Sequence, residues 1–124
     1  MRPTDPTESR IAARSRQGGV GGGHWELLRA DGLALLVRTR NVDDLTVARV
    51  DADRVFARRD ELRVLYVRDH EAGQLSWWLV DRTEAVLVAA RVWSAAQRTE
   101  VLANARLALA ALAAPHPWGE YDPF

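Results

Sequence analysis

None of the side chains in this sequence that could perform catalysis or bind a metal falls in a known catalytic motif. The chain has no Cys, which excludes disulfides, thiolate zinc sites and cysteine nucleophiles. None of its Ser residues stands in a Gly-x-Ser-x-Gly segment, the turn that exposes the nucleophile of an α/β-hydrolase. The three His lack the His-x-His or i, i+4 spacing that favours a metal site. We therefore expect neither a metal nor a cofactor, and a non-catalytic function.

Two adjacent Trp residues, Trp77 and Trp78, lie in an apolar segment that is typical of a strand. Successive side chains of a strand point to opposite faces, so the two indoles must face opposite ways. Trp77 shares its face with Leu75 and Leu79, which marks the core side. Trp78 shares its face with polar residues such as Ser76. Because Trp is enriched at binding hot spots, we predict Trp78 to be a binding residue.

The C-terminal residues 115–124 combine three Pro with three aromatic side chains, Trp118, Tyr121 and Phe124, at a spacing of three. Disordered tails are usually poor in aromatic residues. We therefore expect this tail to dock, either on its own domain or on a partner protein. Trp78 would line the groove that receives it.

Arginine side chains are dense between residues 38 and 68. Neighbouring strands would gather them into an Arg-lined face suited to phosphate or carboxylate groups, with Arg38 and Arg63 as binding residues. Acidic residues interleave with these cations, so ion pairs between strands are the alternative interpretation. The residues concerned are Arg38, Arg40, Arg54, Arg58, Arg59, Arg63 and Arg68, together with Asp51, Asp53, Asp60, Glu61 and Asp69.

Length and charge restrict the class of protein. The 124 residues suffice for one small domain. Seventeen basic residues, all of them Arg, balance seventeen acidic ones, which argues against a broad electrostatic contact with nucleic acid or an anionic membrane. No apolar run is long enough to span a bilayer. The polar N-terminus lacks the apolar core of a secretion signal, so we expect a cytoplasmic location.

Proline and glycine divide the chain into three parts. The five Pro lie at positions 3, 6, 115, 117 and 123, and five of the eight Gly lie between residues 18 and 23. Regular structure can run where Pro is absent, because Pro interrupts helices and central strands. We expect a flexible leader containing Gly and Arg at residues 1–23, a single α+β domain at 24–114 and a tail at 115–124.

Hydrophobic patterning within the domain predicts seven strands. The clearest local indication is Asp31-Gly32 between two apolar runs, which is typical of a tight hairpin because Gly accepts a positive φ. Asp51 and Asp53 are expected in an exposed turn, with ordinary acidity. The predicted strands cover residues 25–30, 33–39, 45–50, 54–58, 62–69, 74–80 and 85–92.

A C-terminal helix is predicted from Ser94 to Ala114. Ser94 and Gln97 form a capping-box pattern, Ala and Leu dominate the segment, and Pro115 ends it. One apolar stripe is enough for packing on a sheet, and this helix has apolar residues left over. We expect the surplus to be covered by the tail or by a second copy of the chain in a homodimer. The residues of this predicted dimer interface are Leu107, Ala110, Ala111 and Ala114.

Two segments allow a second interpretation. Residues 43–59 also show helical spacing of apolar side chains, and residues 84–93 could extend the last helix. If both are helical, the element order is ββαββα. We favour an α+β fold with an antiparallel meander or small barrel of six to seven strands and one long C-terminal helix. This element order resembles that of a pleckstrin-homology-like barrel, by element count alone.

The function expected from these features is a small cytoplasmic module that binds a protein or peptide and forms a homodimer. One alternative is a barrel that binds a small molecule or acts as an enzyme, with an interior pocket lined by Trp25, Tyr66, Trp77 and Trp93. A further alternative is an Arg-dependent nucleic-acid binder, which the neutral net charge makes a weaker interpretation.

Overall fold

The computed structural model describes residues 9–15, 22–114 and 118–121, in which eight strands, two α-helices and one 3₁₀ helix follow one another. The chain begins with β1 (Ser9–Ser15), β2 (Gly23–Arg29) and β3 (Ala34–Arg38), followed by α1 (Leu45–Ala57) and the 3₁₀ helix η1 (Arg59–Glu61). It continues with β4 (Arg63–Asp69), β5 (Gln74–Asp81), β6 (Glu84–Ala89) and β7 (Trp93–Ser94). Helix α2 (Arg98–Ala113) and β8 (Trp118–Tyr121) complete the order.

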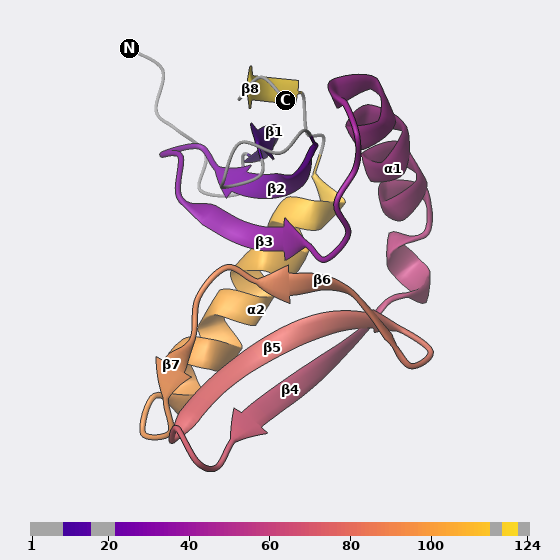
Figure 1. Ribbon diagram of the computed structural model, residues 1–124. Coiled ribbons are helices and arrows are strands. Elements are labelled where there is room, and N and C mark those ends of the chain that lie inside the picture. The colour runs from indigo at the N-terminus through magenta and orange to yellow at the C-terminus, as the bar shows by residue number, and fades with distance from the viewer. Residues whose placement is uncertain (1–8, 16–21, 115–117, 122–124) are drawn as a thin grey trace.

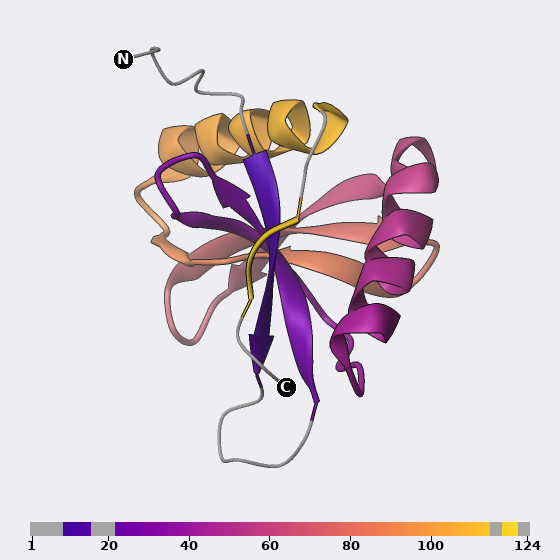
Figure 2. The same cartoon turned by 90° about the horizontal axis from the view of Figure 1, so that it is seen from above.

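All the strands belong to one sheet, with the order β4-β5-β6-β3-β2-β1-β8 and with β7 paired to one end of β5 (Figure 1). Neighbouring strands are antiparallel, except that β8 runs parallel to β1. Within the described residues the sheet is open, and β4 and β8 are its edges. It is strongly twisted, so that β1 and β2 cross the direction of β4, β5 and β6 (Figure 2).

Both helices pack on the same face of the sheet. Helix α1 lies against β2, whereas α2 lies across β3 and β5. The strand register places six large apolar side chains on this covered face, and all six are fully buried. No helix of the described segments covers the opposite face, which we call the outer face. The six buried residues are Trp25, Leu27, Leu36, Trp77, Leu79 and Leu87.

The α+β class predicted from the sequence is confirmed, because an antiparallel sheet is followed by a C-terminal helix. The barrel form of that prediction is not observed, since the sheet is open across the described residues. The element order also differs from that of a pleckstrin-homology-like barrel, because helix α1 replaces the third and fourth predicted strands.

The predicted hairpin at Asp31-Gly32 is confirmed. Strands β2 and β3 pair in antiparallel fashion across this turn, and Arg29 N donates to Leu33 O at 2.8 Å. Gly32 has a φ of +89°, a conformation that a side chain would strain. Asp31 stabilises the turn further, because its Oδ1 accepts a hydrogen bond from Leu33 N at 3.0 Å.

Residues 45–57 form helix α1, so the prediction of two strands at 45–50 and 54–58 is wrong. Asp44 caps the helix, its Oδ1 accepting from Val47 N at 2.8 Å. Five residues then recur at helical spacing and are buried against the sheet, and their charged neighbours face solvent. The mixture of charged and apolar residues that suggested strands therefore also fits a helix with one buried face. The residues of that face are Ala48, Asp51, Ala52, Val55 and Phe56.

Residues 84–89 form strand β6, which confirms the favoured prediction of a strand here over the alternative of a helix. A bulge interrupts its pairing with β5, because Leu79 pairs with Leu87 but Val80 pairs with Ala85. The intervening Val86 has no partner in this register. Its carbonyl oxygen accepts hydrogen bonds from the β3 side, from Thr39 N at 3.3 Å and from Thr39 Oγ1 at 3.1 Å.

The predicted C-terminal helix is confirmed as α2, although it begins at Arg98, four residues after Ser94. One half of the predicted capping box forms, because Gln97 Oε1 accepts from Ser94 N at 3.0 Å. The helix buries one stripe against the sheet, made up of Val101, Ala105, Ala108, Ala111 and Leu112.

Residues 9–15 were assigned to a flexible leader by the sequence analysis, but the structure places them in the sheet as β1, between β2 and β8. Ile11, Ala12 and Ala13 are buried, and Ser9 Oγ donates to the Ala111 carbonyl at 3.0 Å. Four residues of the predicted tail also join the sheet as β8. The ordered fold therefore extends beyond residues 24–114 in both directions.

Across the described residues, neither helix combines the length and the apolar character that crossing a membrane requires.

Enlarging Ala52, which is fully buried where α1 meets the sheet, should destabilise the fold. We expect Ala52→Leu to lower the free energy of unfolding by about 1–3 kcal/mol, because the added carbons overpack the interface. Ala57→Leu, at an exposed position of the same helix, is the control and should change stability by less than about 0.5 kcal/mol. Urea denaturation followed by circular dichroism measures both, and equal stabilities would contradict this packing of α1.

Candidate functional site

Strand β4 is an edge of the sheet, and it exposes two large apolar side chains in its middle. It pairs with β5 on one side, and no other described strand pairs with it. Leu65 is 46% exposed and Tyr66 is 51% exposed. Because neighbouring residues of a strand point to opposite faces, Leu65 lies on the outer face and Tyr66 on the face that carries α2. A long apolar edge is an available template for another strand.

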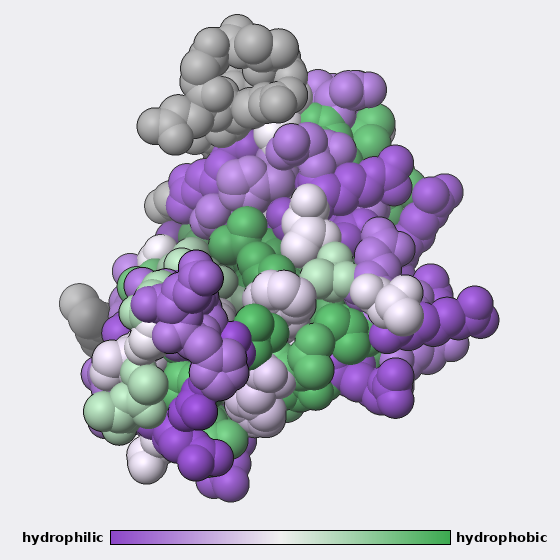
Figure 3. All heavy atoms as spheres, turned by 60° about the horizontal axis from the view of Figure 1, so that its bottom comes forward, coloured by the Kyte–Doolittle hydropathy of each residue, from purple (hydrophilic) through white to green (hydrophobic). Residues whose placement is uncertain are grey.

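A groove of about 290 Å³ lies beside this edge, between the β4–β5 hairpin and the first turns of α2. Its walls are mostly apolar, and two guanidinium groups stand among them. Figure 3 views the molecule from the β4 side and shows hydrophobic residues gathered in the middle of this surface, with hydrophilic residues around them. The groove is lined by Tyr66, Val67, Arg68, Leu75, Ser76, Arg98, Val101 and Leu102.

The outer face carries an apolar row next to the same edge. Register pairs place Leu65 beside Trp78, Trp78 beside Val88, and Val88 beside Val37. All four side chains are partly or largely accessible. Trp77, by contrast, is fully buried on the other face, where its indole Nε1 donates to Asn104 Oδ1 at 2.8 Å. The prediction that the two Trp residues face opposite ways is therefore confirmed.

Three arginines around the β4 edge are not neutralised within the described structure. Arg63 and Arg68 are exposed residues of β4, and Arg98 opens α2 at the groove. None of the three forms a hydrogen bond or an ion pair with a described residue. The nearby Asp69 is engaged in its own turn, where Oδ1 accepts from Glu71 N and Ala72 N at 3.1 Å. The edge is therefore apolar in its middle and charged at its ends, with Arg63 at one end and Arg68 and Asp69 at the other.

Arg38, predicted to bind a ligand, instead forms an internal ion pair with Asp51 of α1. Its Nε donates to Asp51 Oδ2 at 2.8 Å and its Nη2 donates to Oδ1 at 3.2 Å. The indole Nε1 of Trp25 also donates to Oδ2, at 2.8 Å. The third nitrogen of Arg38, Nη1, donates to the Val86 carbonyl at 2.8 Å. The two side chains are only about a tenth exposed, so this pair joins α1 to β2, β3 and β6.

The environment of Asp51 stabilises its ionised form. Burial raises the pKa of this carboxyl, but hydrogen bonds from Arg38 and Trp25 and the charges of Arg38 and Arg40 lower it by more, so the pKa lies below its usual range. The prediction that Asp51 is an exposed turn residue of ordinary acidity is thus wrong. Asp53, two residues later, is exposed.

The predicted dimer interface on α2 is divided by the fold. Ala111 is fully buried in the chain's own core, and Leu107 is partly buried against that core. Ala110 is exposed and Ala114 is half-buried. Leu102 and Leu109 of the same helix are 42% and 38% exposed. Ala111 was expected to need a cover from outside the domain, but β1, which was not predicted, lies next to it in the chain's own fold.

The predicted aromatic tail is described only in part. Trp118 and Tyr121 begin and end β8, whose backbone pairs with β1 at Ile11 and Ala13. Phe124 lies outside the described residues. The structure therefore places two of the three aromatic positions at the sheet edge opposite β4.

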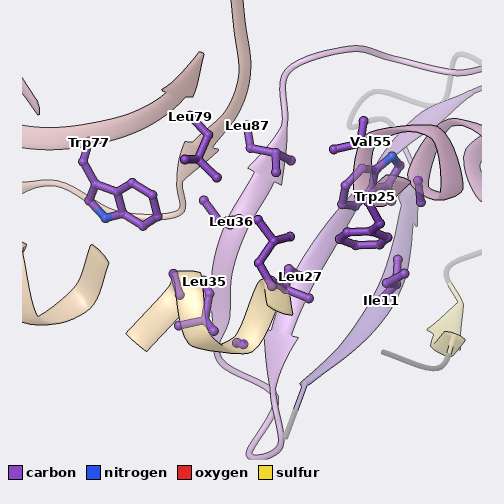
Figure 4. Packing of buried hydrophobic residues seen from close by; sticks show 14 of the residues in the cluster. Ile11, Trp25, Leu27, Leu35, Leu36, Val55, Trp77, Leu79 and Leu87 are labelled. Atoms are coloured by element: carbon purple, nitrogen blue, oxygen red, sulfur yellow. The ribbon is translucent and has the colours of Figure 1, made fainter. Parts of the chain in front are cut away.

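The four aromatic residues proposed for an interior pocket do not line a common cavity. Figure 4 shows Trp25 and Trp77 at opposite ends of the core, with leucine side chains between them. Both are fully buried, and Trp93 is 4% exposed, whereas Tyr66 stands at the surface groove. In the part of the chain that the structure describes, no group of three or more His, Asp or Glu side chains could hold a metal ion.

Sequence reasoning did not single out Leu65, and it placed Tyr66 in an interior pocket. The available indication was an uninterrupted apolar run, residues 64–67, bounded by Arg63 and Arg68. Charged residues that flank an exposed strand are a common protection of sheet edges.

Comparisons with protein-family models, with curated proteins and with solved structures found no match to this chain.

Removing the charge of Asp51 should destabilise the protein in a pH-dependent way. At pH 7 we expect Asp51→Asn to lower the free energy of unfolding by about 3 kcal/mol, because the Arg38 guanidinium is left buried without its counter-charge. The folded-state pKa lies below the unfolded value of about 3.9, so the contribution of the charged group is present above that value. It is lost as the pH falls through the folded pKa, and the variant and the parent should converge there.

Asp53→Asn is the matched control, since it removes the same charge from an exposed position of the same helix. Its unfolding free energy, measured in urea between pH 3 and 7, should stay close to that of the parent. An equal effect of the two substitutions at pH 7 would contradict the role assigned to the buried pair.

Proposed function

We propose that the protein is a small, cytoplasmic, non-catalytic interaction module that binds an extended peptide segment of a partner protein along β4. The observation that carries this proposal is the exposure of Leu65 and Tyr66 in the middle of an edge strand that borders an apolar groove. Both features lie in the described part of the chain, and they occur at one edge of the sheet.

The backbone of β4 supplies the affinity in this proposal. An edge strand has N–H and C=O groups on its free side that can pair with an added strand, and peptide recognition by β-strand addition uses this property. β4 has seven residues, an ordinary strand length, so a peptide strand of similar length could pair with it. The adjacent hairpin partner β5 is anchored in the core by Trp77 and Leu79, so the template is rigid.

The side chains around β4 supply specificity. Alternate residues of an added strand would point to opposite faces of the sheet. On one face they would meet Tyr66 and the groove that Leu102 borders, and on the other face they would extend the apolar row of Leu65 and Trp78. The predicted binding role of Trp78 is kept in this proposal. Apolar residues are therefore favoured in the middle of the ligand.

The charges around the edge favour an acidic partner. Arg63, Arg68 and Arg98 stand at the ends of the apolar region without a carboxylate partner among the described residues. Complementary charge accelerates association and selects among partners. The expected ligand is thus an extended peptide with a short apolar centre and acidic residues on either side of it.

A designed peptide tests this proposal directly. The probe is a fluorescein-labelled peptide of ten residues with a centre of Val, Leu and Tyr and with two Glu at each end. A second peptide with Lys in place of Glu is its control. We expect fluorescence anisotropy to show saturable binding of the acidic peptide and much weaker binding of the basic one, with amide shifts in the NMR spectrum concentrated in β4.

The substitution Tyr66→Ala should weaken binding of the acidic peptide by about tenfold or more, as is typical of an aromatic hot spot. Leu33→Ala is the matched control, because Leu33 is 52% exposed but lies in the β2–β3 turn. Equal loss in both variants, or amide shifts outside β4, would rule out the edge as the binding site.

The expected homodimer is a separate outcome of the same experiments. Two copies of the chain offer each other the same edge, and antiparallel pairing of two β4 strands about a two-fold axis is geometrically allowed. Light scattering after size exclusion distinguishes this case. A parent dimer that becomes a monomer in Tyr66→Ala would assign the edge to a second copy of the chain and overturn the peptide proposal.

A further inference from the structure

A second cavity, of about 260 Å³, lies between the C-terminal half of α1 and the strand ends beside it. It shares no lining residue with the groove at β4. Arg54 and Val55 line it from α1, and Arg58 lines it from the C-cap position of that helix. Arg38, Val86 and Asp81 line it from β3, β6 and β5. On a helix, residues three and four apart occupy one face, so Asp51, Arg54 and Arg58 all face this cavity.

Two of its four guanidinium groups are already neutralised. Arg38 forms the buried pair with Asp51, and Arg58 donates to Asp81 Oδ2 at 2.9 Å and to Glu61 Oε2 at 2.7 Å. The Arg38–Asp51 pair is buried, whereas the pairs of Arg58 lie at the surface.

Arg40 and Arg54 are different, because neither forms a hydrogen bond or an ion pair with a described residue. Glu84 also lines the cavity and forms no ion pair with a described residue. Four arginines and three acids leave the lining with a formal charge of +1. The cavity is therefore electropositive at the two free guanidinium groups.

The placement of these cations is not explained by the stability of α1 alone. Arg54 and Arg58 are a like-charge pair at i, i+4, which is an unfavourable spacing. The helix dipole favours a cation in the last turn, and this effect accounts for Arg54. It does not account for Arg40, which follows β3 on a different segment of the chain and adds its charge close to Asp51.

Guanidinium groups recognise phosphate and carboxylate oxygens through paired N–H donors. We propose that this cavity binds the phosphoryl group of a small phosphate compound, with Arg40 and Arg54 as the groups that contact it. The volume is at the lower end for ligand sites, which excludes a large cofactor. Asp81 and Glu84 repel further negative charge, so the site favours one phosphoryl group over a polyphosphate chain or a nucleic-acid backbone. Val55, Leu62 and Val86 offer an apolar wall to the remainder of an ester.

Isothermal titration calorimetry of the full chain with inorganic phosphate and with phenyl phosphate tests this inference. We expect saturable binding of both compounds at constant ionic strength, and weaker binding of benzoate. Tighter binding of phenyl phosphate would identify the ligand as a phosphate ester, and equal binding would identify it as free phosphate. Both results support the phosphoryl site. Absence of saturation, or equal binding of benzoate, would overturn it.

The variants Arg40→Gln and Arg54→Gln should each weaken phosphate binding by about tenfold, the usual effect of losing one charge-assisted contact. Arg40→Lys keeps the charge but loses the paired donors and should retain part of the affinity. Arg106→Gln, at an exposed position of α2, is the matched control and should bind as the parent does. Thermal unfolding of each variant verifies that it is folded. Equal affinity of the Arg40 and Arg54 variants and the control would reject the proposal.

Discussion

The buried ion pair between Arg38 and Asp51 is the interaction on which the arrangement of helix and sheet depends. A carboxylate removed from water must be compensated by charge and hydrogen bonds. Asp51 meets that requirement only where α1 brings it to Arg38 and to the Trp25 indole at the same time. Arg38 in turn donates from Nη1 to the Val86 carbonyl of β6. Four elements are thus joined at one point, and a shift of α1 by a single residue would separate the charges.

The same constraint explains where binding surfaces remain. With α1 held over β2 and α2 crossing β3 and β5, the far edge of the sheet at β4 is left without a cover among the described residues. The edge keeps charges at its ends, which discourage uncontrolled pairing, but its centre is apolar on both faces. Beside the C-terminal half of α1, Arg38 and Arg58 line a second cavity in which Arg40 and Arg54 form no ion pair with a described residue. We propose that the first surface binds an extended peptide and that the second binds a small anion.

Sequence patterns predicted those elements whose structure is determined by residues close to one another in the chain. The β2–β3 hairpin follows from the conformational freedom of Gly32, and the faces of Trp77 and Trp78 follow from strand alternation. Helix α1 corresponds to the alternative interpretation of residues 43–59, and strands were favoured there because the sequence is compatible with both periods. What decides it is the contact of Asp51 with residues thirteen and twenty-six positions away, which no window of neighbouring residues contains. The candidate site residues show the same difference. The sequence predicted the Arg-rich region, but it did not predict which of these arginines form ion pairs.

The sequence by itself determined the α+β class, the hairpins, the C-terminal helix and the choice of which Trp enters the core. Only the tertiary structure decided that Ser9–Ser15 forms a strand beside β2, that β4 is an edge of the described sheet and that Arg40 and Arg54 form no ion pair with a described residue. The physical reason is that turn chemistry and side-chain periodicity act over a few residues. The partner of a strand and the counter-ion of a buried charge are properties of segments that meet only when the whole chain has folded.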